Sequence, residues 1–344
     1  MVRVALLNDT DKDGHHFGCA RVMGGIRQAL ANRGMSVELA VPSAVEWTKS
    51  ENLIKGLASV DLILINGEGT LHHGRPKAKW LLDVADHPAL KDVPKAVVNM
   101  LWQDNPPEWG TLLGRFDLAQ ARDSKGAAEA ARMSGLEISS FADYSVCWPL
   151  PPMANAERQG IVVGDSVSGR MSAHLADFAI RLRNEKQAPV QFVPVITEAS
   201  TQERHKKLST RVRFFLADLR LRLKTKGRHQ VHWVDDVDAY IAKLSASELS
   251  VTGRFHSVCL SIATRTPFLA LTSNSRKIEA LMEDCGLSLD RIVAPDQLTT
   301  ALVTSRSWDY SDEELSNIDA YLTKGAEGLE TTFDRLKTLA EARQ

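Results

Sequence analysis

Apolar segments rich in β-branched residues alternate with amphipathic segments along most of this chain, and this alternation constrains the fold more than any other feature. Runs of about four to eight apolar residues are typical of buried strands, whereas apolar residues three or four positions apart are typical of amphipathic helices. The predicted strands lie at 2–8, 37–42, 60–67, 95–101, 117–123, 160–166, 190–196, 229–235, 248–253 and 267–273. Strands alternating with helices favour parallel sheets covered by helices on both faces.

A proline-rich segment at 148–160, "WPLPPMANAERQG", interrupts the alternation and lacks any apolar period, as expected of a linker between domains. At 344 residues the chain is longer than one hydrophobic core usually supports. We therefore predict two doubly wound α/β domains, at 1–150 and 151–310. The tail at 311–344 opens with "SDEE" and continues with apolar residues at helical spacing, which predicts a long C-terminal helix packed on the domains.

The balance of charge gives no indication of a strongly charged partner. Lysine and arginine number 42, aspartate and glutamate 43, and the formal net charge of −1 indicates neither a nucleic acid nor a membrane surface. The apolar run before Asn8 is too short for a signal peptide, and no segment approaches the roughly 20 apolar residues of a membrane span. We expect a cytoplasmic protein. Cys19, Cys147, Cys259 and Cys285 lie far apart, so we predict neither a disulfide framework nor a zinc cluster.

Ligands of open parallel sheets bind beyond the carboxyl ends of the strands, which directs attention to the loops there. In "NGEGTLHHG" at 66–74, Gly67 and Gly69 allow a sharp turn whose amides can face an anion or a hydroxyl-rich ligand, although a turn without a ligand needs the same glycines. The segment matches neither a Walker loop nor a dinucleotide fingerprint. Adjacent histidines such as His72 and His73 rarely bind one ion together, so no metal is predicted.

The loop after the first strand, "DKDGHHFG" at 11–18, places His15 and His16 at a strand end. We interpret them as candidates for contact with a bound acceptor substrate. The alternative is a polar loop exposed to solvent.

Arg254 and His256 lie where the strand at 248–253 passes into a helix. The first amides of a helix have no partner inside it, so an anion there meets these amides, the positive end of the helix dipole and a guanidinium group. A histidine beside them can exchange a proton near neutral pH. The pattern indicates an anion site with an acid–base group; a surface arginine and a histidine that only stabilise the helix start are the alternative.

Together these segments resemble the polysaccharide pyruvyl transferases. The resemblance is carried by "NGEGTLHH" at 66–73, "LAQARDSKGAAEAARMSG" at 118–135, "ADYSVCWPL" at 142–150, and the segment at 251–287, which contains Gly-Arg-x-His and begins a helix at Lys277. It implies two Rossmann-like domains facing a cleft in the arrangement of GT-B glycosyltransferases. It also implies transfer of a pyruvyl group from phosphoenolpyruvate to two hydroxyls of a sugar in a polysaccharide or glycoconjugate, with a pyruvate ketal and phosphate as products.

The resemblance also implies roles for individual residues. Arg254 would hold the carboxylate or phosphate of the donor, and His256 would act as general acid or base. A second cation is needed for the other anionic group of the donor, and the candidates are, in order of preference, Arg122, Arg170 and Lys277, with Ser273 as a further candidate donor-binding residue. The implied acceptor-binding residues are His15, His16, Gly67, Glu68, Gly69 and His72. No metal or cofactor is required, and the acceptor would be a sugar or a lipid-linked glycan, which is compatible with peripheral association with a membrane.

One departure from the family weakens this interpretation: "GEG" replaces a triple-glycine turn and adds the carboxylate of Glu68. The main alternative is a GT-B glycosyltransferase with a nucleotide-sugar donor, in which Arg254 and Lys277 neutralise the leaving group and Glu68 or a loop histidine is the base. A third hypothesis is a sugar- or anion-binding protein in which His256 only packs. The three hypotheses differ in the donor that supports turnover: phosphoenolpyruvate in the first, a nucleotide sugar in the second and neither in the third.

Overall fold

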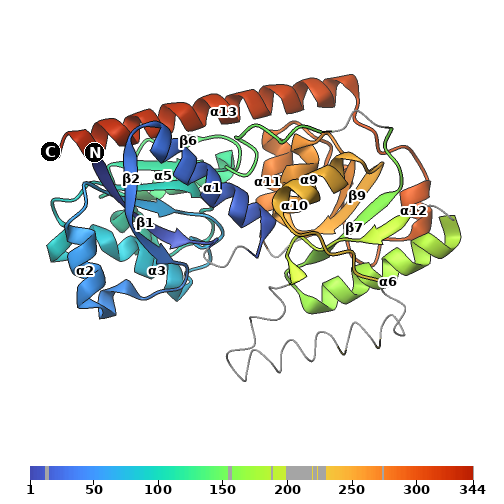
Figure 1. The fold of residues 1–344 in the computed structure, drawn as a ribbon, viewed down its shortest axis with the longest axis horizontal. Coiled ribbons are helices and arrows are strands. Elements are labelled where there is room, and N and C mark those ends of the chain that lie inside the picture. Colours follow the sequence, from blue (N-terminus) through green and yellow to red (C-terminus); the bar gives the residue numbers. More distant parts are fainter. Residues whose placement is uncertain are drawn as a thin grey trace. The chain divides into compact units, whose positions relative to one another are not determined.

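The computed structural model describes residues 1–11, 15–153, 157–186, 189–198, 219, 223, 230–272 and 275–343. The chain divides into two compact units, and each of them is discontinuous in sequence (Figure 1). Unit 1 consists of Met1–Lys12, Val22–Trp148 and Tyr321–Gln344. Unit 2 consists of Asp13–Arg21 and Pro149–Ala320.

Unit 1 is built on a six-stranded parallel sheet with the strand order β2-β1-β3-β4-β5-β6. Its strands are β1 (Val2–Asp9), β2 (Met35–Pro42), β3 (Leu62–Asn66), β4 (Lys95–Met100), β5 (Leu118–Ala121) and β6 (Ser139–Ser140). Every residue of β3 and β4 is buried, which is the expected result when a sheet is covered on both faces. The predicted strands of the first half are therefore confirmed, with shifts of one or two residues at their ends.

In unit 1 the helix at Ser124–Ser134 begins and ends at residues that cap it. The carboxylate of Asp123 accepts a hydrogen bond of 2.6 Å from the amide of Gly126, and Gly135, with φ of 75°, ends the same helix. The helices are α1 (Phe17–Asn32), whose first residues belong to unit 2, α2 (Glu51–Ala58), α3 (Pro76–Leu82), α4 (Pro107–Leu113) and α5 (Ser124–Ser134). Short 3-10 helices lie at η1 (Trp47–Lys49), η2 (Asp83–Ala85) and η3 (Pro88–Leu90).

Unit 2 repeats this architecture with a five-stranded parallel sheet of order β11-β10-β9-β7-β8. Its strands are β7 (Ile161–Ser166), β8 (Val190–Phe192), β9 (Leu249–Gly253), β10 (Phe268–Leu271) and β11 (Ile292–Val293). Its helices are α6 (Gly169–Lys186), α9 (Val237–Ser245), α10 (Phe255–Ala263), α11 (Lys277–Asp284), α12 (Thr300–Thr304) and the 3-10 helix η5 (Leu289–Arg291). All nine residues of α10 are buried, so this helix is part of the core.

The predicted C-terminal helix is present as α13 (Asp312–Glu341), drawn in red in Figure 1. Its first residues belong to unit 2, where Glu314 accepts a hydrogen bond of 2.8 Å from Arg291. Its remaining residues belong to unit 1, where Glu330 pairs with Arg33 at 2.7 Å. None of the helices in the described ranges combines the length and apolar character that crossing a bilayer requires.

The prediction of two α/β domains with parallel sheets is confirmed, but two details differ. In the described part of 229–235 the predicted strand is wrong: only Val231 forms an isolated bridge, with Phe192. The units divide between Trp148 and Pro149, and unit 2 additionally takes Asp13–Arg21, which the sequence analysis had placed in the first domain.

Candidate functional site

Each sheet contains one place where the order of its strands reverses. In unit 1 the chain passes from β1 to β2 on one side and then to β3 on the other side of β1. In unit 2 it passes from β7 to β8 and then to β9 on the other side of β7. Ligands of such sheets bind outside the carboxyl ends of the strands at this reversal. The candidate site residues are therefore sought at the ends of β1 and β3, and at the ends of β7 and β9.

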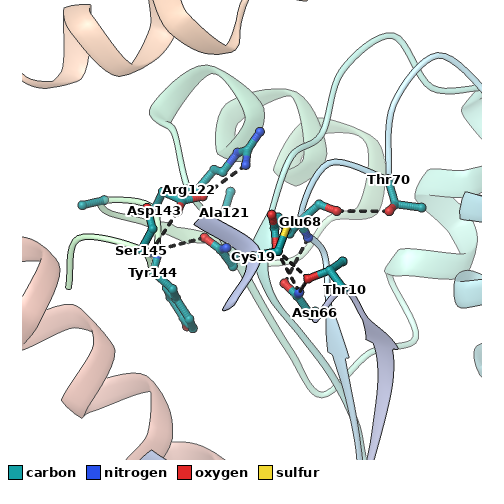
Figure 2. Close-up of polar contacts among 12 residues, drawn as sticks. Thr10, Cys19, Asn66, Glu68, Thr70, Ala121, Arg122, Asp143, Tyr144 and Ser145 are labelled. Carbon is teal, nitrogen blue, oxygen red and sulfur yellow. Dashed lines mark hydrogen bonds and ion pairs between the residues drawn. The ribbon is translucent and has the colours of Figure 1, made fainter. Parts of the chain in front are cut away.

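In unit 1 the ends of β1 and β3 are joined by buried and half-buried polar side chains (Figure 2). Asn8, which has φ of 60°, donates from Nδ2 to the carbonyl oxygen of Asn66 at 2.6 Å and to Oγ1 of Thr70 at 3.2 Å. Thr10 donates from Oγ1 to Oε2 of Glu68 at 2.9 Å, and Nδ2 of Asn66 lies 3.3 Å from the same oxygen. These contacts hold the loop after β3 against the end of β1.

Glu68 is the group of this cluster with acid–base chemistry. The residue is 5% exposed, and its carboxylate accepts hydrogen bonds from the hydroxyl of Thr10 and the side-chain amide of Asn66. Its neighbours shape the turn. A Cβ on Gly67 would lie 2.6 Å from Cα of Met100, Gly69 has φ of 61°, and Nε2 of His72 lies 3.1 Å from the carbonyl oxygen of Gly69. The glycines and His72 thus build the loop that carries Glu68.

Arg122, a candidate donor-binding residue, lies in unit 1 after β5. It is 3% exposed, and Nη1 donates to Oδ2 of Asp143 at 3.1 Å (Figure 2). Oδ1 of Asp143 accepts from the amide of Ser145 at 2.9 Å. This buried ion pair fixes the turn after β6 within unit 1.

In unit 2 the reversal point is occupied by an ion pair between Asp165 at the end of β7 and Arg254 after β9. Nε of Arg254 donates to Oδ2 of Asp165 at 2.9 Å, and Nη2 donates to the same oxygen. Oδ1 of Asp165 accepts from the amide of Val195 at 3.0 Å. The side chain of Arg254 is 15% exposed and that of Asp165 is 7% exposed. The guanidinium is therefore held in one orientation directly before α10.

Two further predicted cations lie at helix starts of unit 2. Lys277 is the first residue of α11, and its Nζ lies 6.0 Å from the centre of the Phe255 ring at the start of α10. Arg170 is the second residue of α6 and is exposed. Ser273, predicted for the same site, lies outside the described residues. Positive charge therefore gathers at the starts of three helices that follow β7, β9 and β10.

His256 is the second residue of α10 and is 7% exposed. The histidines of the first loop also belong to unit 2, although the sequence analysis had assigned them to the acceptor half. The amide of Phe17 donates to the carbonyl oxygen of Val195 at 3.1 Å. His15 Nδ1 lies 3.1 Å from Oγ1 of Thr197, and the rings of His16 and His256 meet edge to face at 5.3 Å. The structure thus brings His16 to His256.

Sequence reasoning passed over Asp165, Asn8 and Thr10. All three lie at or just beyond the end of a predicted strand, next to segments already singled out, so position alone was a usable signal. What the sequence could not show was the pairing: Asp165 contacts Arg254 only because β7 and β9 are neighbours in the sheet.

Neither a protein-family model nor a curated protein sequence matches this chain. Solved structures do resemble it in fold. The glycotransferase of kitacinnamycin matches with a TM-score of 0.59 at 12% identity, over 98% of this chain and 99% of that one. The MnaA–UDP structure from S. aureus matches with a TM-score of 0.59 at 13% identity, over 96% and 94%. The trehalose-phosphate synthase (UDP-forming) from Burkholderia xenovorans matches with a TM-score of 0.52 at 11% identity, over 98% and 100%.

At these identities the likeness shows the fold, which is that of the GT-B glycosyltransferases and related epimerases. The predicted transfer of a pyruvyl group from phosphoenolpyruvate is contradicted, because the similar structures are glycosyltransferases, trehalose-phosphate synthases and UDP-sugar epimerases. The physical reason for the error is that an arginine before a helix start is a general anion site, suited to a diphosphate as well as to phosphoenolpyruvate. The alternative prediction, a nucleotide-sugar donor, is the better supported one.

Proposed function

We propose that this chain is a glycosyltransferase that takes a uridine diphosphate sugar as donor and a hydroxyl group as acceptor. The fold likeness extends over nearly the whole chain, and several of the similar structures were solved with UDP or are named for UDP-linked chemistry. The observation that carries the proposal is the oriented guanidinium of Arg254 at the start of α10, at the strand reversal of unit 2.

The donor diphosphate would bind to unit 2. Its phosphate oxygens would accept hydrogen bonds from the first amides of α10 and from Nη1 of Arg254, since the contacts of Arg254 with Asp165 use Nε and Nη2. When the bond between the anomeric carbon and the phosphate oxygen breaks, the departing UDP gains negative charge. Arg254, the helix start and Lys277 would stabilise that charge.

The acceptor hydroxyl forms the new bond to the anomeric carbon and gives its proton to a base. We assign this role to Glu68, which is buried in unit 1 and is oriented by Thr10 and Asn66. General base catalysis by a positioned carboxylate contributes about 10²- to 10⁴-fold to the rate. His256 remains on the donor side, in unit 2.

Calorimetric titration tests the donor site before the acceptor is known. UDP, GDP, CMP and phosphoenolpyruvate are titrated into the native protein and into Arg254→Ala, with Arg181→Ala on the exposed side of α6 as the control. We expect a preference for UDP that weakens roughly ten- to hundredfold in Arg254→Ala, the usual cost of a lost hydrogen bond to a charged group. Arg254→Ala alone leaves the buried carboxylate of Asp165 without its ion pair. The double variant Asp165→Asn/Arg254→Ala removes that charge as well, so weak UDP binding by the double variant reports the loss of Arg254 itself. A preference for phosphoenolpyruvate, or no nucleotide binding, would overturn the proposal.

Turnover then tests the base. With UDP-sugars and a panel of sugar acceptors, we expect Glu68→Gln to lower kcat about 10²-fold or more while UDP binding is unchanged. Glu137→Gln, an exposed carboxylate of unit 1, is the matched control. Because epimerases share the fold, UDP-GlcNAc is also incubated without acceptor. An epimerised UDP-sugar formed without release of UDP would assign epimerisation instead of transfer.

A further inference from the structure

Three side chains of types that bind transition metals meet in unit 2. Ligand atoms of His16, Cys19 and His256 all lie within 4.8 Å of one another. His16 and Cys19 are three residues apart at the start of α1, and His256 is in the first turn of α10. The first two are half-buried and the third is buried.

The backbone holds this cluster together. His16 forms an antiparallel bridge with Ile196, and the amide of Thr197 donates to the carbonyl oxygen of His15 at 3.0 Å, so the segment before α1 is fixed to the segment after β8. Gly18 then passes so close to His256 that a Cβ on it would lie 2.1 Å from Cγ of the imidazole. The close approach sets the rings of His16 and His256 edge to face at 5.3 Å.

Imidazole nitrogen and thiolate sulfur are the ligands that Zn²⁺ prefers in proteins. Bond lengths of about 2.0–2.1 Å to nitrogen and about 2.3 Å to sulfur imply separations of roughly 3.3–3.6 Å between ligand atoms in a tetrahedral site. Closing from 4.8 Å to that range needs only small side-chain movements. The amide of Cys19 lies 3.4 Å from Nδ1 of His16, a bond at the limit of hydrogen-bonding distance that a metal would easily replace.

We propose that His16, Cys19 and His256 form a zinc site. Three protein ligands leave the fourth position of the tetrahedron to water or to an oxygen atom of a ligand, as in open zinc sites. Arg254, two residues before His256, is paired with Asp165, and Arg21, two residues after Cys19, donates from Nη2 to the carbonyl oxygen of Pro149 at 3.0 Å. The ion pair with Asp165 reduces the repulsion between Arg254 and a bound metal ion. Zinc would fasten the start of α1 to α10, and it would do so whichever group the protein transfers.

Metal binding is measured on the full chain without donor or acceptor, so its outcome is independent of the proposed glycosyl transfer. The chelator-treated protein is titrated with Co²⁺ and followed by the thiolate-to-cobalt charge-transfer absorbance, and Zn²⁺ is then added in competition. We expect one Co²⁺ per chain, displaced by one Zn²⁺. In Cys19→Ser the thiolate band disappears, and in His16→Ala the zinc affinity falls by more than the ten- to hundredfold typical of an outer-shell partner.

Cys285→Ser is the matched control in the same unit, because burial raises the pKa of the Cys285 thiol to about 12 and keeps it protonated. It should bind both metals like the native chain. Circular dichroism checks that each variant is folded. Zn²⁺ should also raise the melting temperature of the native chain but not of Cys19→Ser. The absence of saturable binding, or a thiolate band that survives in Cys19→Ser, would overturn the site.

Discussion

Gly18 leaves no room for a side chain, whereas Gly24 on the same helix does. A Cβ at Gly18 would lie 2.1 Å from Cγ of His256, and a Cβ at Gly24 would meet nothing within 4 Å. The two residues therefore form a natural pair for comparing the effect of one added methyl group on α1.

We expect Gly18→Ala to destabilise the protein by about 1–3 kcal/mol, because His256 or the start of α1 must move. Gly24→Ala should stabilise it by about 0.5–1 kcal/mol, the usual gain of alanine over glycine inside a helix. Thermal unfolding followed by circular dichroism measures both. Equal melting temperatures for the two variants would show that α1 does not pass His256 as closely as described.

At the scale of single residues, the polar residues at the strand ends could be predicted from the sequence, but the contacts between them could not. Arg254, His256 and Glu68 could be singled out because each follows an apolar strand within a few positions. The contact between His16 and His256 could not be foreseen, because it depends on the first loop belonging to unit 2.

At the scale of elements, the start of α13 is tied to η5 by a partly buried ion pair. Nη2 of Arg291 donates to Oε2 of Glu314 at 2.8 Å, and Nη1 donates to the carbonyl oxygen of Trp308 at 2.7 Å. Burial alone would raise the pKa of Glu314, but the hydrogen bonds from Arg291 and from the amides of Ser311 and Ser288, with the charge of Arg291, lower it below its usual value.

A carboxylate whose pKa is lower in the folded than in the unfolded chain stabilises the fold above its unfolded pKa of about 4.3. This contribution is lost as the pH falls through the lower, folded pKa. We expect Glu314→Gln to lower the free energy of unfolding at pH 7 by roughly 1–3 kcal/mol, and with it the melting temperature. The melting temperatures of the native protein and the variant should converge in acid. Calorimetry from pH 7 to about pH 3 measures the difference, and Glu313→Gln, exposed on the same turn, is the control. A constant difference across this range would contradict the assignment.

The elements themselves were largely predictable because their apolar period and caps are local properties of the sequence. β3, β4 and α10 follow directly from apolar runs between polar turns. The segment at 229–235 carries the same signal, yet Val231 alone bridges to Phe192. Whether an apolar segment joins a sheet depends on an available neighbouring strand, which the segment's own composition does not specify.

On the scale of the whole molecule, two residues of α1 that are six positions apart stabilise different units. Phe17 is 1% exposed and lies in the core of unit 2, with its ring 5.2 Å from that of Tyr240. Met23 is fully buried in unit 1, where Nδ2 of Asn66 lies 3.2 Å from its Sδ.

We therefore expect Phe17→Ala to loosen unit 2 and Met23→Ala to loosen unit 1, each at about 2–5 kcal/mol for a large buried side chain. Hydrogen exchange resolved by peptide measures this in the full chain. Phe17→Ala should speed exchange in β8 and α9 and leave β3 and β4 unchanged, and Met23→Ala should do the reverse. The same peptides responding to both variants would contradict the division of α1 between the units.

The architecture of the whole chain was predictable, but the donor was not. Alternating strands and helices on either side of a proline-rich linker are sufficient to indicate two α/β units. The choice between phosphoenolpyruvate and a nucleotide sugar concerns the shape of a site, and both donors present phosphate to the same kind of helix start.

The attachment of residues 15–19 to unit 2 has a consequence for how the protein is made. These residues are synthesised before Val195 and His256, which they contact. Domains usually fold during synthesis from the N-terminus onward. Here the start of α1 cannot complete its contacts with unit 2 until the chain up to His256 has been synthesised, so this part of the fold depends on contacts between residues far apart in the sequence.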